Sequence, residues 1–113
     1  MELGLQGRLA IVIGGSRGIG KAIARELALE GVDVALVARS REQLETAAEE
    51  LRAETGRRVI PFVADVTSRE QIDRTVAQAA EQLGGLHILV NSGSVPGGKA
   101  AGGIDTIIDE EFL

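Results

Sequence analysis

The chain has 113 residues, a formal net charge of −5 and 44% apolar residues, a composition typical of one globular domain. No basic stripe offsets the acidic residues and no apolar run reaches membrane-spanning length, which argues against a nucleic-acid or membrane partner. Cysteine is absent, and the first seven residues lack the basic start and apolar stretch of a signal peptide. We therefore expect a cytoplasmic protein that contains neither a disulfide nor a thiol nucleophile.

Apolar runs and helical patterns alternate along the chain. Four apolar runs predict strands at about residues 8–13, 32–37, 58–63 and 87–90. Helices are expected after the first three strands, over about 18–30, from Ser40 to Gly56 and from Thr67 to Gly84. Ser40 with Gln43, and Thr67 with Glu70, have the spacing of capping boxes.

This alternation predicts an α/β fold: a doubly wound parallel sheet with helices on both faces and strand order 3-2-1-4. Pro61 suits the edge position that this order gives the third strand. The fourth strand would form the other edge, although its nearly uniform apolar sequence is typical of a strand flanked on both sides. Residues 109–113 resemble the first turns of a helix that is cut off, so the chain looks truncated after the fourth strand. We expect the exposed fourth strand to find a partner, by homo-oligomerisation or aggregation.

A glycine-rich turn, with Gly14, Gly18 and Gly20, joins the first strand to the first helix. Glycines let phosphates approach the backbone, and the amides of a helix N-terminus bind anions. The pattern alone is a weak signal, but a strand before it and a helix after it favour a dinucleotide site. The alternative is a tight turn that binds no ligand.

The end of the second strand lies about 20 residues past the glycine turn, where such folds contact the adenosine ribose. A carboxylate there selects NAD, whereas this chain has Arg39 followed by Ser40. Arg39 and Arg17 together could bind the 2′-phosphate of NADP, and the Ser16 hydroxyl could add a donor. The alternative is that both arginines are solvated surface residues.

Two further strand ends carry polar residues. Asp65 follows the third strand, where it could accept from an adenine amino group with Val66 packing nearby, or could simply cap the loop. Asn91, at the carboxyl end of the fourth strand, could bind ligand, bridge backbone groups, or do both. His87 lies at the opposite end of that strand, and we expect it to have a structural role.

These motifs resemble the N-terminal part of the classical short-chain dehydrogenases/reductases along nearly the whole chain. The T-G-x-x-x-G-I-G motif of the family corresponds to residues 13–20, with Ile13 in place of threonine. The D-V pair is matched by Asp65-Val66, and N-N-A-G is matched in part by Asn91-Ser92-Gly93-Ser94. Residues 37–40 are similar to those of NADP-preferring members, including 3-oxoacyl-carrier-protein reductases.

The resemblance implies a Rossmann-type, NADP-binding domain over residues 1–113. The cofactor-binding residues that it and the residue chemistry indicate are Gly14, Ser16, Arg17, Gly18, Ile19, Gly20, Arg39, Ser40, Asp65, Val66, Asn91, Ser92 and Gly93. The intact protein would move a hydride between NADP(H) and a small carbonyl or alcohol substrate.

The catalytic groups of this family cannot be assigned in the chain. The family uses a serine, a Tyr-x-x-x-Lys pair and a further asparagine, all C-terminal to the matched stretch, and this chain has no tyrosine. No catalytic residue is predicted, and we expect the chain alone to be inactive. The alternative function is a non-catalytic dinucleotide-binding or sensor module; a flavodoxin-like or receiver domain fits the glycine spacing less well.

Overall fold

The computed structural model describes residues 6–14, 18–92 and 106–109. Its strands are β1 (Leu9–Ile13), β2 (Asp33–Ala38), β3 (Val59–Val63), β4 (Ile88–Asn91) and β5 (Thr106–Asp109). Its helices are α1 (Gly18–Leu29), α2 (Arg41–Thr55) and α3 (Arg69–Leu83). The predicted first four strands and three helices are therefore present, with bounds that differ by one or two residues.

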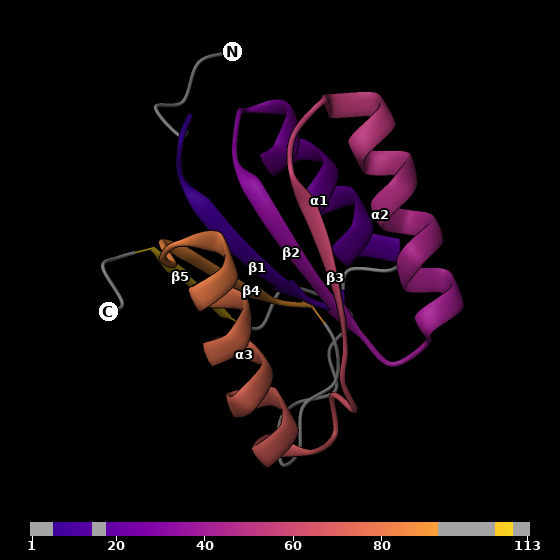
Figure 1. Ribbon diagram of the computed structural model, residues 1–113, viewed down its shortest axis with the longest axis vertical. Coiled ribbons are helices and arrows are strands. Elements are labelled where there is room, and N and C mark those ends of the chain that lie inside the picture. Colours follow the sequence, from indigo (N-terminus) through magenta and orange to yellow (C-terminus); the bar gives the residue numbers. More distant parts are fainter. Residues whose placement is uncertain (1–5, 15–17, 93–105, 110–113) are drawn as a thin grey trace.

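The strands form one sheet in the order β3-β2-β1-β4-β5 (Figure 1). Strand β1 lies at its centre and pairs in parallel with β2, through Ile11 and Ala35, and with β4, through Ile11 and Leu89. Strand β3 is the edge strand next to β2, and Pro61 lies within it, as its sequence predicts. The predicted order 3-2-1-4 is confirmed.

The fifth strand corrects two expectations. Residues Thr106–Asp109 pair antiparallel with β4, so Asp109 lies at the end of a strand and not at the start of a helix. The acidic residues after Ile108 suggested the first turn of a helix, but the β-branched run Thr106-Ile107-Ile108 favours a strand. Strand β4 is therefore not an edge, which agrees with its apolar sequence. Residues 110–113 lie outside the described residues.

Helices cover both faces of the sheet, as the alternating pattern predicts. Side chains alternate along β1, so Ala10 and Val12 face α1 and α2, whereas Ile11 and Ile13 face α3. Figure 1 shows α1 and α2 on one side of the sheet and α3 on the other.

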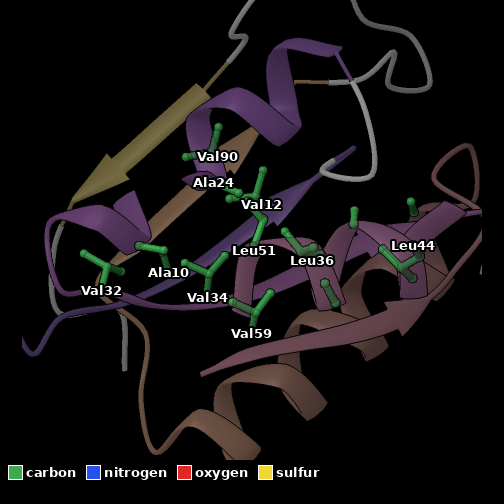
Figure 2. Packing of buried hydrophobic residues seen from close by; sticks show 14 of the residues in the cluster. Ala10, Val12, Ala24, Val32, Val34, Leu36, Leu44, Leu51, Val59 and Val90 are labelled. Atoms are coloured by element: carbon green, nitrogen blue, oxygen red, sulfur yellow. The ribbon is translucent and has the colours of Figure 1, made fainter. Parts of the chain in front are cut away.

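The core on the α1/α2 side is built from small and medium-sized aliphatic side chains (Figure 2). Leu36 of β2 and Leu44 and Leu51 of α2 are fully buried there. From α1, Ala24 and Ala28 are buried in this cluster. Because two aromatic residues are all that the chain contains, close packing of aliphatic side chains supplies the apolar burial.

The helix ends follow local sequence signals. Ser40 caps α2 by accepting a hydrogen bond from the Gln43 amide at 3.3 Å, as predicted. The predicted cap of α3 is wrong by one residue: Ser68, and not Thr67, accepts from the Gln71 amide, at 3.2 Å. Either residue type can cap a helix, and Thr67 instead bonds to Asp65, as described below.

Candidate functional site

The carboxyl ends of the four parallel strands lie at one edge of the sheet, where open α/β sheets bind ligands. Strand β1 ends there at Ile13, β2 at Ala38 and β4 at Asn91. The sheet topology therefore brings the glycine turn, Arg39 and the segment after β4 to one edge.

The glycine turn is fixed from both neighbouring strands. On one side the Gly14 amide donates to the Val37 carbonyl of β2 at 2.6 Å. On the other side the Ser92 amide donates to the Ile13 carbonyl at 3.0 Å. Gly14 has φ 86°, a left-handed conformation that glycine adopts without a steric penalty.

Gly20 allows α1 to begin directly against this turn. A Cβ atom at position 20 would overlap the Gly14 carbonyl oxygen and lie 2.5 Å from Ser92 Oγ. This is the close packing of helix against strand that the last glycine of such a motif permits. The glycine spacing thus has a structural reason that does not depend on a ligand.

Ser92 is half-buried and bonds to the turn. Its hydroxyl donates to the carbonyl oxygens of Ile13, at 3.1 Å, and Gly14, at 3.4 Å. The cofactor contact predicted for Ser92 stays a prediction, and these bonds show that its hydroxyl also positions the turn. The sequence offered no signal for this role, because Ser92 lies 78 residues from Gly14.

The first turn of α1 carries no acidic residue, so no side chain of that turn compensates the positive end of the helix dipole. Gly18 begins this helix, and Ile19 beside it is 50% exposed. Ser16, Arg17 and Gly93, three of the predicted site residues, lie outside the described residues.

Arg39 directly follows β2 and is exposed, with 68% of its side chain accessible. Its Nη2 donates to Asp65 Oδ1 at 3.3 Å, which links the ends of β2 and β3. Ser40, the next residue, uses its hydroxyl as the N-cap of α2. The structure therefore brings Arg39 and Asp65 together, a contact that the sequence analysis did not predict.

Asp65 is held by its own loop. Its Oδ1 accepts from the amide of Thr67 at 2.9 Å and from the hydroxyl of Thr67 at 2.6 Å. These two bonds, and to a smaller extent Arg39, hold the pKa of Asp65 below its ordinary value, so the carboxylate stays ionised near neutral pH. The loop-capping role considered for Asp65 is thus present, and Val66 packs against the core on the α3 side.

Thr67 is a site residue that the sequence analysis read only as a helix cap. The signal was an aspartate two residues before a threonine, which is the spacing of a side-chain turn onto the backbone. Both donors of Thr67 bond to Asp65, and the cap of α3 is the next residue, Ser68.

Asn91 pairs with Ile13 across the β1–β4 ladder. His87 lies near the opposite edge, where its Nδ1 accepts from the Leu9 amide at 3.0 Å, in agreement with a structural role. Within the described residues no group of three His, Cys, Asp or Glu side chains could hold a metal ion.

The residues at this edge fit a dinucleotide. Space is open around Gly18 at the helix start, where a Cβ would meet no atom within 4 Å. A phosphate could approach the backbone there, and the exposed guanidinium of Arg39 lies at the end of the neighbouring strand. A bound nicotinamide dinucleotide would supply the hydride chemistry, and these residues would hold its adenosine and phosphate groups.

The chain belongs to the short-chain dehydrogenase family, whose family model matches residues 8–112. This defines the class of protein, an oxidoreductase family with a Rossmann-like fold, and excludes the flavodoxin-like and receiver alternatives.

Among its relatives, 2,3-dihydro-2,3-dihydroxybenzoate dehydrogenase of Bacillus subtilis is 38% identical over 109 residues, which are 96% of this chain and 40% of that enzyme. L-sorbose reductase from Gluconobacter frateurii, solved with NADPH and L-sorbose, superposes with a TM-score of 0.74 at 39% identity, over 79% of this chain and 34% of that one. An NAD+-bound xylitol dehydrogenase superposes with a TM-score of 0.72 at 36% identity, over 77% of this chain and 33% of that enzyme's chain. The chain thus spans well under half the length of the proteins it matches.

None of the described helices combines the length and the apolar character needed to cross a membrane.

Proposed function

We propose that residues 1–113 form the NADP(H)-binding domain of a short-chain oxidoreductase. The protein containing this domain would transfer a hydride between NADP(H) and a small carbonyl or alcohol substrate. The expected cofactor-binding residues remain those of the glycine turn, the end of β2, the loop after β3 and the segment after β4.

The observation that carries the proposal is the placement of Arg39 beside the glycine turn. The Gly14 amide of the turn bonds to the Val37 carbonyl of β2. Strand β2 ends at Ala38, and Arg39 is the next residue. A dinucleotide whose phosphates lie at α1 would place its adenosine ribose toward the end of β2. A positive charge at that point favours a 2′-phosphate and a negative charge would oppose it. The NADPH bound to L-sorbose reductase agrees with this choice, whereas the xylitol dehydrogenase holds NAD+.

The chain by itself should bind cofactor without turning over substrate. It has no tyrosine, and in this family a tyrosine assisted by a lysine serves as the acid/base group. Lys99, the last lysine in the sequence, therefore has no tyrosine partner in this chain.

Calorimetric titration of the chain with NADPH and with NADH tests the proposal. We expect NADPH to bind at least about tenfold more tightly, a difference of roughly 1.4 kcal/mol. Arg39→Gln should remove most of that preference, because the 2′-phosphate loses a charge-assisted donor. Arg41→Gln is a matched control: Arg41 is 72% exposed and forms a surface ion pair with Glu45 at 3.6 Å.

Absence of binding to either nucleotide would overturn the proposal. Equal binding of both would remove the NADP preference but keep a dinucleotide site. The alternative function, a non-catalytic dinucleotide-binding or sensor module, predicts the same titration. The two are distinguished by whether the full-length protein reduces or oxidises a panel of carbonyls and alcohols with the bound cofactor.

We also propose a cytoplasmic location and association into a homo-oligomer. Both rest on the family resemblance and on the sequence composition. Cell fractionation tests the location, and light scattering of the full-length protein tests the association.

A further inference from the structure

Asp65 and a cofactor phosphate would compete for the Arg39 guanidinium. The proposed function assigns both Arg39 and Asp65 to cofactor binding, whereas the structure bonds them to each other. Arg39 Nη2 lies 3.3 Å from Asp65 Oδ1. The two residues extend from adjacent parallel strands, since Ala38 at the end of β2 pairs with Val63 at the end of β3. A phosphate that binds Arg39 therefore arrives next to a carboxylate.

This carboxylate cannot easily move away. Both donors of Thr67 bond to Asp65 Oδ1, the Asp65 amide donates to Gln71 Oε1 of α3 at 2.9 Å, and the Asp65 carbonyl accepts from the Ser68 amide at 2.9 Å. Arg39 is anchored less firmly: its side chain is 68% exposed, and within the described part of the chain it bonds to Asp65 alone. The fixed member of the pair is thus the negative one.

We propose that Asp65 is a specificity-determining residue that lowers the preference for a 2′-phosphate by competing for the Arg39 guanidinium. This inference rests on the proposed function. A 2′-phosphate must either draw Arg39 away from Asp65 or share it at short range with a fixed negative charge, and both cost affinity. A 2′-hydroxyl carries no charge and meets neither cost. The consequence is a site whose selectivity for NADP over NAD is smaller than Arg39 alone would give.

The test uses two nucleotides that differ in the 2′-phosphate alone, adenosine 2′,5′-bisphosphate and adenosine 5′-monophosphate, titrated against the full 113-residue chain. Asp65→Asn keeps the size and an oxygen that can accept from Thr67, but removes the charge. We expect the ratio of the two dissociation constants to shift toward the bisphosphate by about two- to fivefold, the range set by exposed ion pairs. If residue 65 instead contacts adenine, the substitution should change the dissociation constants of both nucleotides by the same factor and leave their ratio unchanged.

Asp73→Asn is the matched control. Asp73 is 72% exposed and pairs with Arg69 at 3.6 Å on α3, so the variant makes the same change in net charge and loses a similar surface pair. The ratio should not change. In an Arg39→Gln background, Asp65→Asn should shift the ratio less than in the parent, because the competition acts through Arg39.

Three results would overturn the inference: an unchanged ratio, a shift toward the monophosphate, or the same shift in the Arg39→Gln background. The proposed function is judged separately, from the parent chain: it stands if the parent binds the bisphosphate more tightly than the monophosphate, whatever the variants do. If the folded parent binds neither nucleotide, the proposed function and the inference fail together. Circular dichroism melting of each variant confirms that it is folded.

Discussion

Gly20 is the residue at which α1 and the turn after β1 come closest. The residue is buried, and the position that a Cβ would take is already occupied by the Gly14 carbonyl and approached by Ser92 Oγ. The obstacle is backbone, which cannot rotate away as a flexible side chain could. The same crowding that excludes a side chain holds the helix N-terminus next to the glycine turn.

Gly20→Ala should therefore destabilise the chain, although alanine is the better helix former. We expect the free energy of unfolding to fall by about 1–3 kcal/mol, the cost of overpacking. The measurement is urea unfolding followed by circular dichroism. Ala22→Ser, which also adds one heavy atom but at an exposed position of α1, should cost about 0.5 kcal/mol or less. A Gly20→Ala chain as stable as the parent would contradict the packing argument.

At the scale of elements, two ion pairs join α1 to α2 across the helix surface. Lys21 Nζ bonds to Glu50 Oε1, and Arg25 Nε bonds to Glu54 Oε1 at 2.9 Å. Each member lies four residues from its equivalent in the other pair, so both pairs lie on facing sides of the two helices. The hydrogen bond from Lys21, followed by its charge, lowers the pKa of Glu50 below the ordinary value of 4.5.

This shift gives the α1–α2 contact a defined pH dependence. A carboxylate whose pKa is lowered on folding stabilises the native state above its unfolded pKa, and that contribution is lost as the pH falls through the folded pKa. Glu50→Gln should thus be less stable than the parent at pH 7, and the difference should close as the pH is lowered below about 4.5. Urea titrations between neutral and acid pH measure it.

The control for this prediction is Glu49→Gln. Glu49 is the exposed neighbour of Glu50, and within the described residues no ion pair of Glu49 is found. Its substitution removes the same charge from α2, so a general effect of net charge would appear in both variants. A stability difference for Glu50→Gln that stays constant with pH would show that the ion pair with Lys21 does not stabilise the native state.

At the scale of the whole molecule, β5 covers the edge of β4 and becomes the outer strand of the sheet. By pairing with β4 through Leu89 and Ile108 and through Val90 and Ile107, it occupies the backbone groups that we expected to be exposed. Unpaired strand edges are sites of association, so the antiparallel strand should limit association through β4.

Single proline substitutions in β5 test whether its pairing protects the edge of β4. Alternate residues of an antiparallel edge strand bond to the neighbouring strand, so one of Ile107 and Ile108 directs its amide to β4 and the other directs it away. Proline at the first kind of position removes a bond to β4, whereas proline at the other suits an edge strand. We expect one of the variants Ile107→Pro and Ile108→Pro to raise the apparent mass in light scattering. The other should match the parent, and two variants that both match the parent would show that β5 does not protect the edge.

The sequence by itself determined the parallel part of the fold. Apolar runs, the helical spacing of apolar residues, Gly56 and Gly84 after the helices and the alternation of elements are local signals, and together they predict the order 3-2-1-4. The sequence also predicted where the glycine turn and Arg39 lie in the fold, because their spacing follows from one strand–turn–helix–strand unit.

The tertiary structure alone decided which distant groups meet. Ser92 bonds to Gly14 and Arg39 to Asp65 because parallel strands align their carboxyl ends, although 78 and 26 residues separate these pairs. The direction of β5 likewise depends on β4, which offers a free ladder to a short β-branched segment. Local sequence describes the conformation that a segment prefers, whereas pairing partners are fixed by where the rest of the chain places them.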